Sequence, residues 1–196
     1  MISKLAEKYA KLLLTQNMIY ETDFEIYHYG LFVLLSNVLL LMYCLIVGAI
    51  FKIVFCSFLF YLFFFILHKF SGGFHVKTEL CCQVITLLSF FLGMMAIKHS
   101  TLIKPQPLIL VYIICSVLLI VLSPAETPQK PLTKKECSAF KKLTLLVVLI
   151  GILIVVILNI LELYIEANTL VITIVLQTIS VILGKLLNKK LLSNNI

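Results

Sequence analysis

A histidine and a cysteine within one short polar segment are the residues of this chain best suited to chemistry. His75 and Cys82 lie seven residues apart in the stretch SGGFHVKTELCC, residues 71–82, which interrupts two long apolar runs. A cysteine attacks as its thiolate, and a nearby imidazole favours the thiolate and can protonate a leaving amine. At a boundary between membrane and water, this pair predicts a membrane-embedded cysteine peptidase.

The second half of the segment predicts the start of a helix. Thr78 is a suitable N-cap, and Glu79 would be the first helical residue, with its charge placed well against the helix dipole. Cys81 and Cys82 would then lie in the first turn, where a helix N-terminus stabilises a thiolate. Because neighbouring helical residues point about 100° apart, only one of the two cysteines can occupy a given position. Cys82 is our candidate nucleophile.

The first half of the segment must bring the histidine to the cysteine. On one straight helix His75 and Cys82 would be separated by about 10.5 Å along the axis, which is too far for a hydrogen bond. The pair therefore requires His75 in the loop, folded back over the helix start, and Gly72-Gly73 permits such a turn. A solvated interfacial histidine is the alternative. The remaining histidines have no comparable neighbourhood, and we interpret them as interfacial: His28, His68 and His99.

Composition indicates a membrane protein. Hydrophobic residues make up 62% of the 196 residues and the mean hydropathy is +1.13, well above the level of soluble domains. All the basic residues are lysines, and they lie in clusters between apolar runs, which suits anionic lipid headgroups better than nucleic acid. The six cysteines form no CxxC pair, so neither a structural zinc site nor a cofactor is expected.

Hydrophobic patterning predicts an all-α integral membrane protein, with a single membrane domain over residues 1–196. Residues 1–29 are expected to form an amphipathic helix, interfacial or packed on the bundle, followed by a polar connection. A break at Gly48 and Lys52 predicts a hairpin over 31–67, for which one long tilted helix is the alternative. The six apolar runs that predict about six spans are 31–48, 53–67, 80–97, 106–123, 143–161 and 169–187.

Lysine placement predicts the orientation. With six spans and a cytoplasmic N-terminus, 13 lysines lie in inner segments and 3 in outer ones. This asymmetry follows the positive-inside rule and predicts a multi-pass protein of the cell membrane with both termini cytoplasmic. The two longest polar loops, 68–79 and 124–142, then face the cytoplasm, and the candidate active site lies with them.

The segment SGGFHVKTELCC resembles the signature of the AgrB family, membrane endopeptidases of Gram-positive quorum-sensing systems. In that family a Gly-Gly-aromatic-His motif precedes the catalytic cysteine by seven residues, which corresponds to His75 and Cys82 here. The stretch LSPAETPQKPL, residues 122–132, is similar to the Pro-rich, lysine-bearing loop of the family. Many members carry an arginine where this chain has His68, so a role that needs a guanidinium is not carried over.

The resemblance implies a specific reaction. An AgrD-like propeptide would be cleaved on the C-terminal side of the future signal, through a thioester on Cys82 and with help from His75. An internal cysteine or serine of the substrate would then close a thiolactone or lactone ring. Gly72, Gly73, Ser123 and Glu126 are candidate supporting residues. The expected partners are the propeptide and membrane lipid, and a homodimer stays open.

Two other classes of protein are considered. A peptide or small-solute transporter without proteolytic activity would need polar residues inside the spans, and the clearest ones are Asn37, Asn159 and Gln177. A non-catalytic membrane scaffold would leave the spacing of His75 and Cys82 as coincidence.

Overall fold

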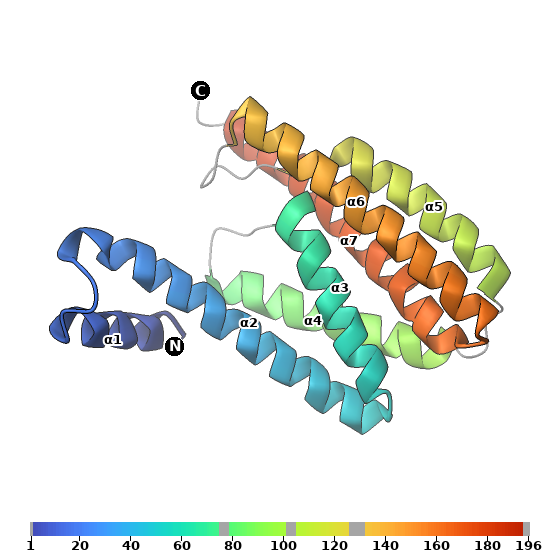
Figure 1. Cartoon of the computed structure of the whole chain (residues 1–196), viewed down its shortest axis with the longest axis horizontal. Helices are drawn as coiled ribbons and strands as arrows, with labels where there is room; N and C mark the ends of the chain where they lie inside the picture. Colours follow the sequence, from blue (N-terminus) through green and yellow to red (C-terminus); the bar gives the residue numbers. More distant parts are fainter. Residues whose placement is uncertain (1, 75–78, 101–104, 126–131, 194–196) are drawn as a thin grey trace. The chain divides into compact units, whose positions relative to one another are not determined.

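A computed structural model describes residues 2–74, 79–100, 105–125 and 132–193 of the chain (Figure 1). Within these ranges the chain is helical, and its only strand-like pairing is one isolated bridge. In chain order the elements are α1 (Ile2–Thr15), η1 (Glu21–Asp23, a 3-10 helix), α2 (Phe24–Phe51), α3 (Val54–Ser71), α4 (Glu79–His99), α5 (Pro105–Leu122), α6 (Lys134–Ile160) and α7 (Tyr164–Ser193).

The helices confirm the prediction of an all-α membrane protein. By length and composition, five of the described helices can cross a membrane: α2, α3, α4, α6 and α7. α5 is also apolar over Leu108–Leu122, a shorter stretch than those of the other five helices. Each of the six apolar runs coincides with one helix from α2 to α7.

Two helices begin earlier than their apolar runs. α2 starts at Phe24, so the predicted polar connection is wrong over residues 24–29. α6 starts at Lys134, inside the predicted loop 124–142, because Thr133 and Glu136 form a capping box. Thr133 Oγ1 accepts from Glu136 N at 3.3 Å, and Thr133 N donates to Glu136 Oε2 at 2.9 Å. Polar residues therefore continue a helix at each of these places, because caps and backbone hydrogen bonds require no apolar side chain.

The chain divides into two compact units, Met1–Ile46 and Val47–Ile196, which we call the N-terminal and the C-terminal unit. In the N-terminal unit, Ala6 and Ala10 of α1 are buried, whereas Leu5, Tyr9 and Leu12 are 44–49% exposed. This helix therefore keeps an uncovered apolar side beside its lysines, which is the character expected at a lipid interface.

A tight turn connects α2 to α3, as predicted for the hairpin. Lys52 has a φ of +59°, and Ile53 N donates to Gly48 O at 2.8 Å, which is the left-handed ending that commonly terminates helices. A Cβ on Gly48 would collide with the Ser57 hydroxyl of α3. The alternative of one long helix over 31–67 is therefore wrong.

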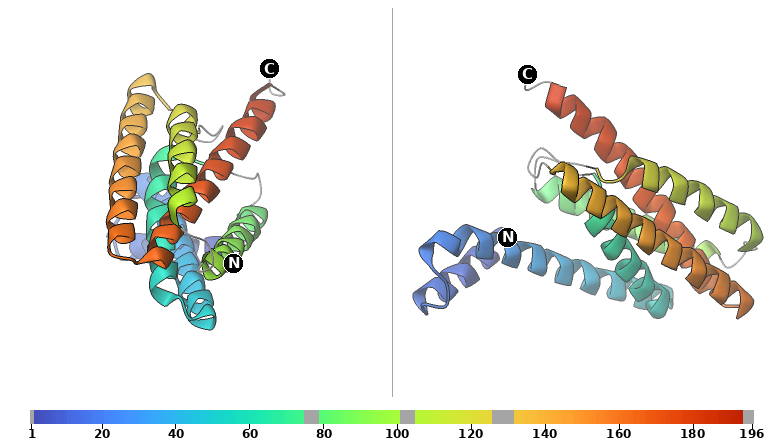
Figure 2. Two further views of the ribbon diagram at one scale, coloured as in Figure 1. Left: turned by 90° about the vertical axis from the view of Figure 1, so that its right-hand side faces the viewer. Right: turned by 45° about the horizontal axis from the view of Figure 1, so that its top comes forward.

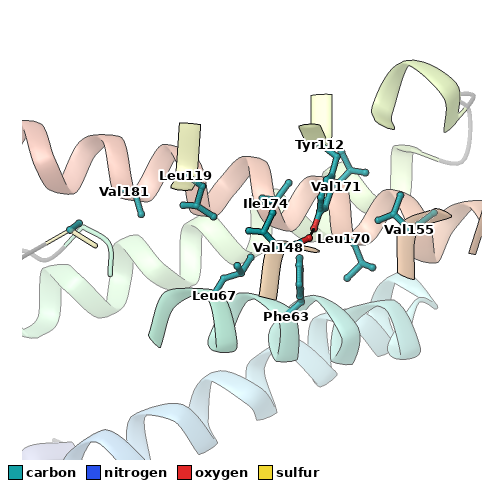
Figure 3. Packing of buried hydrophobic residues seen from close by; sticks show 12 residues of the cluster. Phe63, Leu67, Tyr112, Leu119, Val148, Val155, Leu170, Val171, Ile174 and Val181 are labelled. Carbon is teal, nitrogen blue, oxygen red and sulfur yellow. Dashed lines mark hydrogen bonds between the residues drawn. The ribbon is translucent and has the colours of Figure 1, made fainter. Parts of the chain in front are cut away.

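α7 is the central helix of the C-terminal unit, where it contacts α3, α4, α5 and α6. Figure 2 shows α7 beside α5, and in its left view α7 meets α6 at one end and diverges from it toward the C-terminus. In Figure 3, Phe63 and Leu67 point from α3 toward α7. The labelled members of the core cluster come from four helices and are Phe63, Leu67, Tyr112, Leu119, Val148, Val155, Leu170, Val171, Ile174 and Val181.

Candidate active site

Cys82 lies in the first turn of α4, as the sequence predicts. The helix begins at Glu79, so Cys82 is its fourth residue. Its side chain is half-buried, whereas that of Cys81 is exposed, which shows that the two thiols face different surroundings. Partial exposure next to the helix N-terminus leaves Cys82 accessible to a substrate and close to the positive end of the helix dipole. His75 and Glu126 lie outside the described residues.

The segment Ser71–Phe74, which we call the anchor segment, leads directly to His75. It starts where α3 ends, and Gly72 adopts φ +69° and ψ −164°, a conformation that is essentially restricted to glycine. Gly72 N donates to His68 O at 3.0 Å. A Cβ on Gly72 would lie 2.5 Å from Ala125 O. The first glycine of the motif is therefore required both by its backbone angles and by a close neighbour.

The anchor segment meets the second predicted loop. Gly72 and Ala125 form a parallel β-bridge, in which Ala125 N donates to Ser71 O at 2.8 Å. The two loops predicted to share one face of the membrane are thus in contact. Ser123, a predicted supporting residue, is 5% exposed, and its Oγ lies 3.5 Å from Ile120 O of α5. This hydroxyl is directed at its own helix, which is a structural role.

α7 holds the anchor segment from the other side through Gln177, Ser180 and Gly184. Gln177 is fully buried, and its Nε2 donates at 2.7 Å to both Ser71 Oγ and Gly72 O. Ser180 Oγ accepts from Phe74 N at 3.1 Å.

Gly73 and Gly184 let the backbones approach each other. A Cβ on Gly184 would lie 2.6 Å from Gly73 O and 3.1 Å from Phe74 N. A Cβ on Gly73 would lie 2.7 Å from Ser180 Oγ and would also collide with the His68 ring. At both predicted supporting glycines, Gly72 and Gly73, an added Cβ would therefore collide with neighbouring atoms.

Sequence reasoning missed this contribution of α7 and considered Gln177 only as a polar residue within a span. The available signal was the spacing of Gln177, Ser180 and Gly184, which places polar and small residues on one face of an otherwise apolar helix. His68, interpreted from sequence as interfacial, lies beside the anchor segment. Its ring stacks on Phe64 with centroids 5.4 Å apart and lies against Gly73.

The end of the C-terminal unit that carries the anchor segment is basic. Exposed lysines occur near the end of α3, along the first turns of α6 and next to Gly184 on α7: Lys69, Lys134, Lys135, Lys141, Lys142 and Lys185. Five of them fall in the predicted loops 68–79 and 124–142, but all six lie on helices. Within the described ranges no cluster of three or more His, Cys, Asp or Glu residues could hold a metal ion.

Comparison with known proteins gives one match. The model of the family Accessory gene regulator B, AgrB, matches residues 2–181, which includes α1, the anchor segment, Cys82 and Gln177. No curated protein and no solved structure matches the chain.

Proposed function

Because the chain belongs to the AgrB family, whose members are membrane peptidases of propeptide processing, we propose that it is a cysteine endopeptidase acting on a quorum-sensing propeptide. Cys82 is the nucleophile and His75 is the acid–base residue. The products are the released C-terminal tail of the propeptide and a thiolactone or lactone ring. The observation that carries this proposal is the position of Cys82, half-buried in the first turn of α4 and downstream of an anchored segment that ends beside His75.

The first half of the reaction forms a thioester. His75 takes the thiol proton of Cys82, and the thiolate attacks the scissile carbonyl at the C-terminal end of the future signal. When the C–N bond breaks, the imidazolium gives this proton to the leaving amine, so the tail departs as a neutral amine terminus. The signal portion remains bound to Cys82 as a thioester.

The second half closes the ring. His75 now takes the proton of an internal cysteine or serine of the bound peptide, and that side chain attacks the thioester carbonyl. The bond to Cys82 breaks and the proton returns to the Cys82 thiolate, which restores the enzyme. Thioester exchange involves bonds of similar energy, whereas hydrolysis of the thioester by water is strongly favourable, so water must be kept away until the ring has formed. A site at the lipid boundary is suited to that requirement.

The basic end of the C-terminal unit supports a substrate with an acidic tail. Exposed lysines occur on α3, α6 and α7 at this end of the unit, and clustered like charges attract anions at low salt. The capping carboxylate of Glu136 is engaged by Thr133. By the positive-inside rule, the same lysines favour a site at the cytoplasmic face, where a newly made propeptide arrives.

Transport without proteolysis is less well supported. Of the polar residues that a pathway would need, Gln177 is bonded to the anchor segment, and Asn159 Nδ2 donates to Val155 O of its own helix at 2.8 Å. Both amide nitrogens are therefore engaged by hydrogen bonds within the protein.

Reconstitution without an energy source tests the proposal. The purified protein in lipid vesicles, supplied with an AgrD-like propeptide, should release the tail and form an adduct that hydroxylamine cleaves. Cys82→Ala and His75→Ala should lose both signals, and Cys81→Ala, the matched control, should keep them. Tail release by Cys82→Ala would refute the assignment of the nucleophile.

A further inference from the structure

Gln177 is a polar side chain in the centre of the C-terminal unit whose presence packing does not explain. It is fully buried within an apolar helix, and both hydrogen bonds of its amide nitrogen go to the end of α3. Among the described residues its Oε1 has no hydrogen-bond partner. A buried acceptor without a partner is destabilising, so an apolar side chain of equal size would fill this space more favourably. The two hydrogen bonds are the remaining reason for an amide here.

These hydrogen bonds belong to a row of contacts along one face of α7. Residues at i, i+3 and i+7 share a helix face, and Gln177, Ser180 and Gly184 have this spacing. Together they contact all four residues of the anchor segment. The contacts are two hydrogen bonds from the Gln177 amide, one hydrogen bond to the Ser180 hydroxyl and one close backbone approach at Gly184. Ala125 fixes Ser71 O from the opposite side. The chain is therefore held from two directions up to the residue before His75.

We propose that Gln177 is a positioning residue that fixes the anchor segment so that His75 is delivered to Cys82. This inference rests on the proposed peptidase function. Gln177 acts through the anchor segment and sets the direction in which the chain leaves α3 by holding Ser71 Oγ and Gly72 O with one amide group. Its loss moves the imidazole and leaves the thiol where α4 places it.

A role in packing alone predicts different behaviour. Loss of packing lowers the amount or stability of the protein and leaves the reactivity of correctly folded molecules unchanged. A positioning role changes the chemistry of Cys82 in molecules that are folded, because the thiolate depends on the imidazole. Alkylation of Cys82 by iodoacetamide reports on this chemistry without a substrate.

The experiment uses the full chain in vesicles of phosphatidylcholine and phosphatidylglycerol, with the other five cysteines replaced by serine or alanine. Gln177→Met removes the donor and keeps the size. We expect its alkylation rate at pH 7 to fall about tenfold and its pH profile to move toward that of His75→Ala, because a misplaced imidazole no longer favours the thiolate. The double variant should match His75→Ala, since both changes act on one interaction.

Two further variants complete the design. Thr173→Val, the matched control, removes a hydroxyl that is fully buried one turn earlier on α7 and donates to Thr169 O; we expect a wild-type profile. Ser180→Ala removes only the acceptor for Phe74 N at a half-buried position, and we expect a smaller shift in the same direction. If Gln177→Met fails to accumulate in the membrane, the alkylation profile of Ser180→Ala decides between positioning and packing.

Turnover gives the second measurement. With the AgrD-like propeptide that the wild-type protein cleaves, Gln177→Met should lower kcat about 10–100-fold and leave KM within about twofold, the pattern of a misplaced catalytic group. Wild-type alkylation profiles in both Gln177→Met and Ser180→Ala would overturn the inference. An unchanged profile in His75→Ala, or cleavage by Cys82→Ala, would instead overturn the proposed function.

Discussion

Substitution of Gly72 by alanine should separate the two loops that meet at the candidate active site. Gly72 has φ +69° and ψ −164°, and a side chain in this region raises the energy by about 1–3 kcal/mol. The added Cβ would also lie 2.5 Å from Ala125 O and 3.1 Å from Ala125 N. Both are backbone atoms, so no side-chain rotation relieves the collision.

The size of the effect of Gly72→Ala follows from comparing this strain with the free energy of the hydrogen bond that joins the two loops. The bridge contains one backbone hydrogen bond, Ala125 N to Ser71 O at 2.8 Å, which contributes about 1 kcal/mol net. Strain of about 2 kcal/mol exceeds that contribution, so opening the bridge is the favourable response. The ratio of docked to open loops then falls about 30-fold.

We therefore expect Gly72→Ala to lower kcat for tail release by up to about 30-fold. Its melting temperature in mild detergent should fall by only about 2–4 °C, because the loss is confined to the bridge and the core cluster stays intact. Gly30→Ala is the matched control: its Cβ meets nothing within 4 Å on exposed α2, and alanine favours the helix. Wild-type kcat in Gly72→Ala would refute the reasoning from backbone strain.

Three more predictions concern orientation, ring closure and pH. In a background without native cysteines, a cysteine placed in 124–142 should resist an impermeant thiol reagent in intact cells, and one in 162–168 should react; labelling of the former would move the site out of the cytoplasm. Replacing the internal cysteine of the propeptide by alanine should give acyl-enzyme or linear peptide, and a cyclic product detected by mass spectrometry would exclude closure through that thiol. The exposed Lys11 ammonium lies 2.6 Å from the Glu7 carboxyl and lowers its pKa. Any stabilisation from this pair is therefore present when the pH is above the ordinary carboxyl range, and it is lost as the pH falls through the lowered pKa of Glu7. Lys11→Met should raise the titration midpoint of Glu7 in carboxyl ¹³C NMR, and an unchanged midpoint would contradict this origin.

The membrane helices and the start of α4 were predictable because their signals are local. Long apolar runs indicate spans whatever packs against them, and the turn at Lys52 is marked by a single interruption between two such runs. The first-turn position of Cys82 followed from the residues just before it. Local chemistry also marks the start of α6, where Thr133 and Glu136 have the spacing of a capping box. The surrounding polar residues, lysines among them, were instead interpreted as part of the loop 124–142.

The support of the anchor segment could not be predicted in the same way. Gln177 and Ser71 are distant in sequence, and their hydrogen bond exists only because α3 and α7 pack side by side. A glutamine within a span has several interpretations until its neighbours are known, of which a transport pathway is one. The need for Gly72 was expected from the freedom of glycine to turn, whereas the collision with Ala125 depends on the second loop.

The contact at Gly184 bears on where the chain can be shortened. The family similarity ends at residue 181, yet the backbone surface on which Gly73 and Phe74 rest is formed three residues later. A version trimmed to the similarity boundary would retain His75, Cys82 and Gln177 and still lack one wall of the anchor segment. For expression or crystallisation, the safe cut therefore lies at least one helical turn beyond Gly184.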